Sequence, residues 1–182
     1  MEAINKRIDE LLAQNDIVVI AIDGKCTSGK TTLAAKLAEI YDCHVFHMDD
    51  FFLRPEQRTP ERFAEVGGNV DYERFKEEVL TPLKAGQAFS YRPFDCSTFT
   101  LADPVCVTPK KLNILEGTYS HHPYFGNPYD LKIILTVDEE TQKQRILQRP
   151  AFLHKRFFEA WIPMENQYFD DFKIPCQADI IL

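Results

Sequence analysis

The sequence has few cysteines, and they show no pairing that would suggest a covalent or metal framework. The 182-residue chain has five of them, an odd number, and none belongs to a C-x-x-C motif. Disulfide scaffolds and zinc sites need paired, regularly spaced cysteines, so the pattern argues against both. Free thiols are typical of the reducing cytosol, and we expect a cytoplasmic protein. The cysteines are Cys26, Cys43, Cys96, Cys106 and Cys176.

An excess of positive charge is also missing. Lys and Arg together number 21 against 28 Asp and Glu, so the net charge is −7. A general nucleic-acid-binding surface needs clustered positive charge, and we therefore expect no nucleic-acid partner. No apolar run approaches the length of a membrane span, so we expect no membrane partner either. Residues 3–14 have the pattern of an amphipathic helix that contains acids, unlike a signal peptide.

Internal repeats and low-complexity linkers are absent as well. A chain of 182 residues can bury a substantial core, and we expect residues 1–182 to form a single domain. His121 and His122 stand beside Pro123 without a second ligand pair at metal spacing, and we interpret them as loop residues. The sequence leaves a homo-oligomer open.

One phosphate-binding motif is present. It reads G-x-x-x-x-G-K-T, and it lies between an apolar β-branched run at 16–23 and a helical pattern at 30–41. Strand, glycine-containing loop and helix form the context that this motif requires. We expect the backbone N–H groups and the helix N-terminus to bind the phosphates of ATP or GTP. The expected nucleotide-binding residues are Gly24, Lys25, Cys26, Thr27, Ser28, Gly29, Lys30, Thr31 and Thr32.

Three side chains predict the chemistry at the phosphates. Lys30 supplies a positive charge to the triphosphate, and Thr31 offers its hydroxyl to Mg²⁺. Glu116 ends the apolar run Leu112-Asn113-Ile114-Leu115 and precedes Gly117, where a carboxylate that holds Mg²⁺ or its waters would lie. Many strands end in an acidic residue, so the prediction of a metal-binding role for Glu116 depends on the presence of the phosphate motif. We expect Mg²⁺ as a cofactor, with Thr31 and Glu116 at the metal.

Strands and helices alternate along the chain. This order predicts a three-layer α/β/α fold of the P-loop NTPase class, with a mainly parallel five-stranded sheet. The stretch 85–111, rich in aromatics, Pro and Thr, interrupts the alternation; we expect a small β-hairpin insertion there that projects over the site, and a helical lid at 145–160. The expected strands are 16–23, 43–48, 112–115, 131–137 and 178–182, and the expected helices are 3–14, 30–41, 71–84, 138–148 and 152–171.

Two adjacent acids follow the second expected strand, which we expect to neighbour the strand before the phosphate loop. Because side chains alternate across a strand, only one of Asp49 and Asp50 should face the phosphates. A phosphoryl-transfer enzyme needs a carboxylate that accepts the proton of the acceptor hydroxyl, and one of these acids can be that base. The alternative role is a helix N-cap.

Basic residues gather at 145–156. Arg145 and Arg149 are four positions apart, which places them on the same face of a helix. Arginines on a mobile lid can close over the triphosphate, neutralise transition-state charge and exclude water. A solvated helix face is the alternative for either of them.

These motifs together resemble the uridine kinase and phosphoribulokinase family of P-loop kinases. The phosphate loop, Asp49-Asp50-Phe51-Phe52, Asp71-Tyr72 and Glu116-Gly117 occur in the family's order, over most of the chain from about residue 16. The Asp-Asp-Phe-Phe element is also similar to nicotinamide riboside kinases, which are relatives. The resemblance implies that Asp49 is the general base for a sugar 5′-hydroxyl, that Asp71 holds ribose hydroxyls, and that Glu116 assists Mg²⁺.

The expected hairpin departs from the uridine kinase pattern. Members of that family carry a Tyr-Asp pair followed by a His, and this chain has Phe94 at the Tyr place and Phe99 at the His place. A phenyl ring can stack on a base but cannot hydrogen-bond to its edge, and Tyr91 and Arg92 are additional candidates for acceptor contacts. Glu165, Asn166 and Gln167 are either substrate contacts or helix surface. The expected substrate-binding residues are Asp50, Asp71, Tyr91, Arg92 and Phe94.

The sequence therefore predicts an ATP-dependent kinase that phosphorylates a hydroxyl of a nucleoside-like small molecule. In this prediction Asp49, Lys30, Arg145 and Arg149 are catalytic. A kinase for another ribosyl or sugar compound is the alternative within this class. A nucleotide-dependent ATPase or switch is the alternative from a different class. Such a switch should lack a pocket-forming hairpin, and the aromatic stretch 85–111 with the paired acids favours the kinase.

Overall fold

A five-stranded parallel sheet forms the centre of the protein. The computed structural model describes residues 1–182, and the strand order is β2-β7-β1-β8-β9. Every neighbouring pair in this sheet is parallel, which confirms the expected α/β architecture. The five strands are β1 (Val18–Gly24), β2 (Cys43–His47), β7 (Leu112–Glu116), β8 (Leu131–Leu135) and β9 (Ile180–Ile181).

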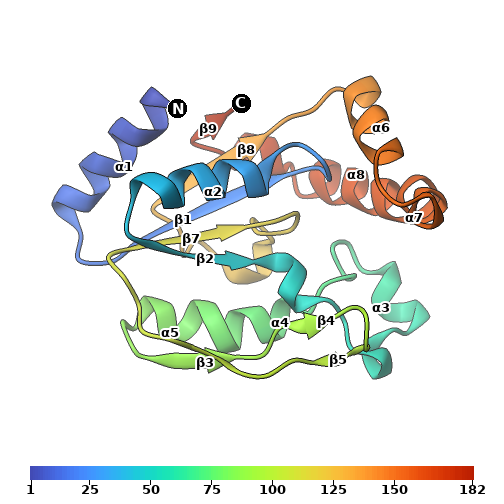
Figure 1. The fold of residues 1–182 in the computed structure, drawn as a ribbon, viewed down its shortest axis with the longest axis horizontal. Helices are drawn as coiled ribbons and strands as arrows, with labels where there is room; N and C mark the ends of the chain where they lie inside the picture. The colour runs from blue at the N-terminus through green and yellow to red at the C-terminus, as the bar shows by residue number, and fades with distance from the viewer.

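Helices cover both faces of the sheet (Figure 1). Alternate residues of β1 point to opposite faces: Val18, Ile20 and Ile22 join one buried cluster with α1 and α2, and Val19 and Ala21 join the other. The second cluster includes side chains of the segment 72–84 and of α8. The longer helices are α1 (Glu2–Gln14), α2 (Lys30–Ile40), α6 (Glu139–Leu147), α7 (Ala151–Arg156) and α8 (Ile162–Asp171).

The two other expected helices are continuous but contain wider turns. The stretch 71–84 consists of α4 (Tyr72–Phe75), a π-helical turn at Lys76–Leu80 and α5 (Thr81–Lys84). The stretch 152–171 begins as α7, passes through a second π turn at Phe157–Trp161 and continues as α8. The short elements not foreseen are α3 (Pro60–Ala64) and the 3₁₀ turns Met48–Phe51 (η1), Pro55–Gln57, Pro123–Phe125 and Ile174–Gln177.

A hairpin interrupts the α/β order at the predicted place. Its outer pair is β3 (Phe89–Tyr91) with β6 (Val105–Val107), and its tip is β4 (Phe94–Asp95) with β5 (Thr100–Leu101), both antiparallel. Figure 1 shows it running along α4 and α5. Tyr91 and Val107 belong to the buried cluster on that side of the sheet. The hairpin therefore packs against helices rather than projecting over the phosphate loop.

Two further expectations can be compared with the structure. None of the helices is long and apolar enough to cross a membrane. All five cysteines are free thiols, three of them exposed. The sheet order corrects one sequence expectation: β7 lies between β1 and β2, so the strand that precedes Asp49 does not neighbour the strand that precedes the phosphate loop.

Candidate active site

The loop between β1 and α2 has the backbone shape of a phosphate cradle. Thr27 and Gly29 both adopt positive φ, at 62° and 102°, which turns the amide groups of the loop away from a helical or extended path. At Gly24 a Cβ atom would lie 2.4 Å from the carbonyl oxygen of Leu135, so only glycine fits beside β8. Lys30 begins α2, and the N-terminus of that helix therefore points at the loop.

The Lys30 ammonium group is positioned by the loop itself. Its Nζ donates hydrogen bonds to the carbonyl oxygens of Gly24, at 2.7 Å, and Lys25, at 3.0 Å. The side chain is buried. A buried lysine held by two carbonyls presents its charge at one fixed place, which is the property that phosphate binding requires.

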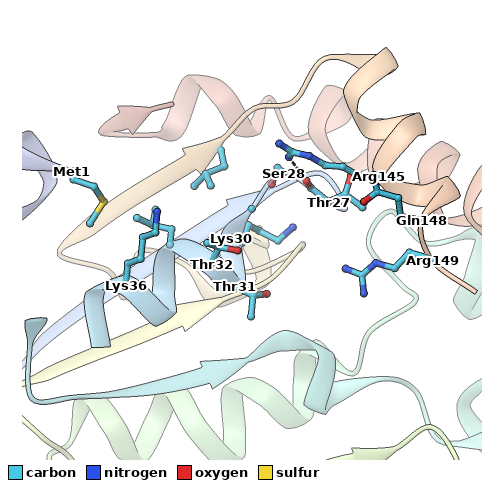
Figure 2. A pocket seen from close by; sticks show the side chains of 13 residues that line it. Met1, Thr27, Ser28, Lys30, Thr31, Thr32, Lys36, Arg145, Gln148 and Arg149 are labelled. Carbon is cyan, nitrogen blue, oxygen red and sulfur yellow. Dashed lines mark hydrogen bonds between the residues drawn. The ribbon is translucent and has the colours of Figure 1, made fainter. Parts of the chain in front are cut away.

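A cavity of about 680 Å³ opens in front of the loop, and we call it the phosphate cavity. Thr27, Ser28, Gly29, Lys30, Thr31 and Thr32 line it. Figure 2 shows Lys30, Thr31 and Thr32 on the α2 side, and Arg145 and Arg149 approaching from the opposite wall. Most of the loop predicted from the motif therefore faces one open space, bounded by the predicted arginines.

The two arginines differ in what they contact. Arg145 Nη1 donates to the carbonyl oxygen of Thr27 at 2.7 Å, so this side chain braces the loop (Figure 2). Arg149 makes no hydrogen bond within the protein that would fix its guanidinium group. The expectation of a shared helix face is wrong, because α6 ends at Leu147 and Arg149 lies in the connection to α7.

A second pair of side chains supplies oxygen atoms beside the loop. Thr31 Oγ1 donates to Glu116 Oε1 at 3.2 Å, and His47 Nδ1 lies 2.5 Å from the same oxygen. Glu116 is buried at the end of β7, and its hydrogen bond raises the pKa of His47. No group of three or more His, Cys, Asp or Glu side chains surrounds a common point. A hydroxyl and one carboxylate fit a hard cation that takes its other oxygens from phosphates and water, as Mg²⁺ does.

A second cavity, of about 320 Å³, adjoins the first, and we call it the acceptor cavity. Asp49 lines it together with Lys30, Thr31 and Glu116. Asp49 as a residue is exposed, but the atoms around its carboxylate reduce the hydration of that group. This desolvation, together with the nearby Glu116 charge, raises the pKa of Asp49 above its ordinary value.

The close approach of Asp49 to Glu116 depends on Gly117. A Cβ atom at Gly117 would lie 2.6 Å from Cβ of Met48, and its φ is +138°. The turn η1, which carries Met48, Asp49 and Asp50, therefore packs directly on the end of β7. Strand alternation was the wrong basis for separating the two acids, since both lie in this 3₁₀ turn and not in β2.

Asp50 and the hairpin residues lie away from both cavities. Asp50 is half-buried and lines neither of them. Burial, together with the charge of Asp50, raises the pKa of Tyr91 to about 12. Tyr91 stacks on Phe51 at 5.5 Å between ring centroids, and Phe94 is buried beside Phe99. Arg92 donates to backbone carbonyls at the hairpin tip.

Asp71 caps a helix. Its Oδ1 accepts a hydrogen bond from the backbone N–H of Arg74, the side chain is buried, and Oδ2 has no hydrogen-bond partner. It lines a third, highly charged cavity with Arg54 and Arg74. In this structure the expected substrate-binding set is thus not gathered around Asp49.

The sequence motifs did not predict several of the side chains that line the acceptor cavity. Glu165, Tyr119 and Trp161 all line it. Glu165 therefore faces this cavity and is not part of the outer helix surface. Gln142 donates to the carbonyl oxygen of Cys26 and so braces the loop beside Arg145. Of these residues, the sequence offered only Glu165 as a candidate substrate contact, together with Asn166 and Gln167.

Known structures share this fold. The structure of a possible uridine kinase from Bacillus stearothermophilus has a TM-score of 0.72 and 23% sequence identity, and the match covers 100% of each chain. The structure of the YGR205w protein has a TM-score of 0.61 and 16% identity, over 94% of this chain and 86% of the other. No protein-family model matches the sequence, and no curated protein matches it. Both identities are below 25%, and the TM-scores show that these two structures share the fold of this chain.

Proposed function

We propose that this protein is an ATP-dependent kinase that transfers the γ-phosphate to a hydroxyl of a nucleoside or similar small molecule. The observation that supports this proposal is that the two cavities share lining residues. Thr27, Lys30, Thr31 and Arg149 line both of them. A phosphate donor in the first cavity and an acceptor in the second would thus share one wall, which is the arrangement that direct transfer requires.

The residues at this shared wall would have different roles in phosphoryl transfer. Lys30 and the loop amides hold the phosphate oxygens, and Thr31 and Glu116 would hold Mg²⁺, which neutralises charge on the triphosphate when bound. Asp49, which lines the acceptor cavity, would accept the proton of an acceptor hydroxyl. Desolvation and the nearby Glu116 charge raise the pKa of Asp49, which makes its carboxylate a stronger base than that of an ordinary aspartate. Arg149, which lines both cavities, would stabilise charge that develops on the transferred group.

A nucleoside is the acceptor that the resemblance of the motifs to uridine kinases supports best. Four aromatic residues in the acceptor cavity, Phe52, Tyr119, Phe157 and Trp161, suit a flat ring. A kinase for another ribosyl or sugar compound, such as nicotinamide riboside, is the second candidate, because none of the hairpin side chains that would read a pyrimidine lines the cavity. ATP or GTP is the donor, and five free thiols support a cytoplasmic location.

A nucleotide-dependent switch or ATPase is disfavoured by the acceptor cavity. A switch needs only water at the γ-phosphate, whereas this chain has about 320 Å³ of lined space beside Asp49. The test is a panel of nucleosides and sugars with ATP and Mg²⁺, followed by ADP formation and by the mass of the product. We expect ADP only with an acceptor and a product heavier by one phosphoryl group. ADP formation that is independent of every acceptor would support the ATPase.

A further inference from the structure

Glu165 is a carboxylate in the acceptor cavity that the proposed transfer does not use. It lies on α8, is buried, and its Oε2 accepts a hydrogen bond of 2.8 Å from the backbone N–H of Cys26. Cys26 belongs to the phosphate loop, so this carboxylate lies against that loop within the acceptor cavity. Burying a carboxylate at such a place costs desolvation free energy, so the presence of Glu165 there requires a physical explanation.

The position of Glu165 is fixed from two sides. One turn further along α8, Tyr168 is fully buried and its hydroxyl donates to Asp23 Oδ2 at 2.8 Å. Asp23 immediately precedes the loop in β1 and also accepts from the N–H of His121. The helix is therefore anchored to the end of β1, and Glu165 cannot swing out of the cavity without breaking this core contact.

The acceptor cavity carries more negative than positive side chains. Its carboxylates are Asp49, Glu116 and Glu165, and its cations are Lys30 and Arg149. Both cations also line the phosphate cavity, where the donor's phosphates would engage them. In the proposed function Mg²⁺ would offset the charge of Glu116, and Asp49 is assigned to the acceptor hydroxyl. Glu165 is therefore the carboxylate left to act on the charge of the acceptor.

Two neighbours of Glu165, the backbone N–H of Cys26 and the Lys30 ammonium group, favour its ionised form. Burial raises the pKa of Glu165, and these two groups oppose that rise. Partly buried charges are screened by solvent much less than surface charges. A negative group on the acceptor would therefore be repelled strongly, whereas neutral or positive groups would be tolerated among the aromatic rings.

We propose that Glu165 is a specificity-determining residue that restricts the acceptor to uncharged or cationic compounds and rejects those carrying a carboxylate or phosphate. This inference rests on the proposed kinase function and narrows its substrate class. It concerns binding of the acceptor, and Glu165 takes no part in proton transfer. The hydroxyl of Tyr119, buried in the same cavity wall and without a hydrogen-bond partner, is a neutral group suited to such an acceptor.

The test uses pairs of acceptors that match in size and differ in the charge of one group. One pair is nicotinamide riboside and nicotinic acid riboside, and the other is 5-carbamoyluridine and 5-carboxyuridine; in each, a carboxylate replaces a carboxamide of the same size. We expect the wild-type protein to use the carboxamide member with a kcat/KM higher by on the order of tenfold, mainly through KM. In Glu165→Gln this ratio should fall by a similar factor. The amide oxygen of Gln can still accept from the Cys26 N–H, so the fold is retained.

Glu159→Gln is the matched control, because Glu159 is exposed and lines neither cavity. It should leave the ratio of the two acceptors unchanged. A wild-type protein that prefers the carboxylated member, or a ratio that stays the same in Glu165→Gln, would overturn the inference while leaving the kinase intact. If neither pair nor any other nucleoside or sugar is phosphorylated, the proposed function fails, and the inference with it.

Discussion

The hydroxyl of Thr31 and the carboxylate of Glu116 lie 3.2 Å apart although 85 positions separate them in the sequence. Thr31 lies in the first turn of α2 and Glu116 ends β7, and the parallel pairing of β1 with β7 brings these two ends to the same edge of the sheet. Carboxyl ends of parallel strands meet at one edge, which is where ligands bind in open α/β sheets. This pair is the basis for the Mg²⁺ site in the proposed function.

The first prediction concerns Mg²⁺. Glu116→Gln keeps the shape of the side chain but removes its charge. We therefore expect the Mg²⁺ concentration for half-maximal activity to rise by roughly tenfold, which is the size of effect seen when a group that supports a bound metal is lost. The measurement is ATP turnover with acceptor across a Mg²⁺ titration. Glu39→Gln, an exposed change on α2, should leave the titration unchanged. An identical Mg²⁺ requirement in Glu116→Gln would remove this residue from the metal site.

The second prediction separates the two adjacent acids. Asp49→Asn should lower kcat by roughly a hundredfold, as expected on losing a general base, with little change in ATP affinity. Asp50→Asn should be milder, because Asp50 lines neither cavity. Steady-state kinetics on both variants provide the comparison, and a larger loss for Asp50 would reverse the assignment.

The pH dependence of the wild-type protein checks the same assignment. A general base works only when ionised, so kcat/KM should fall as the pH drops through the pKa of Asp49. Because desolvation and Glu116 raise that pKa, the fall should come at a higher pH than for an ordinary aspartate. Absence of this acidic limb in Asp49→Asn would identify its source.

The third prediction assigns different roles to the two arginines. Arg149 lines both cavities without an internal hydrogen bond, so Arg149→Ala should lower kcat by about a hundredfold or more and leave thermal stability unchanged. Arg145 holds the Thr27 carbonyl, so Arg145→Ala should mainly weaken ATP binding by loosening the loop. Hydrogen exchange with a non-hydrolysable ATP analogue should show added protection across 145–156. Unchanged protection with full activity in both variants would leave these arginines as solvated surface.

The fourth prediction tests the packing that positions Asp49. Gly117→Ala places a methyl group 2.6 Å from Cβ of Met48, and overpacking of this kind costs about 2 kcal/mol of unfolding free energy. Because η1 must shift, turnover should fall while ATP affinity is retained. Gly126→Ala is the control, since its φ is also positive, +73°, but its added methyl meets no atom within 4 Å. Equal effects of both variants on stability and turnover would attribute the result to backbone strain alone.

The sequence by itself determined the fold class and the phosphate loop. Both depend on local signals: the apolar run of β1, the glycines at 24 and 29, and the helical pattern after Lys30 lie within one continuous stretch. The hairpin within 85–111 was predictable for the same reason. Short-range steric and hydrogen-bonding preferences are enough to specify such features.

Only the tertiary structure decided which side chains share a cavity. The order of the sheet placed β7 between β1 and β2, and the 3₁₀ turn η1 set the directions of Asp49 and Asp50. The packing of the elements also buries Asp71, Tyr91 and Phe94. It brings Glu165 within hydrogen-bond distance of the Cys26 N–H, although 139 positions separate the two residues. Such contacts depend on how separate elements pack, which no local pattern encodes, because the free energy of burial acts on surfaces that meet only in the folded chain.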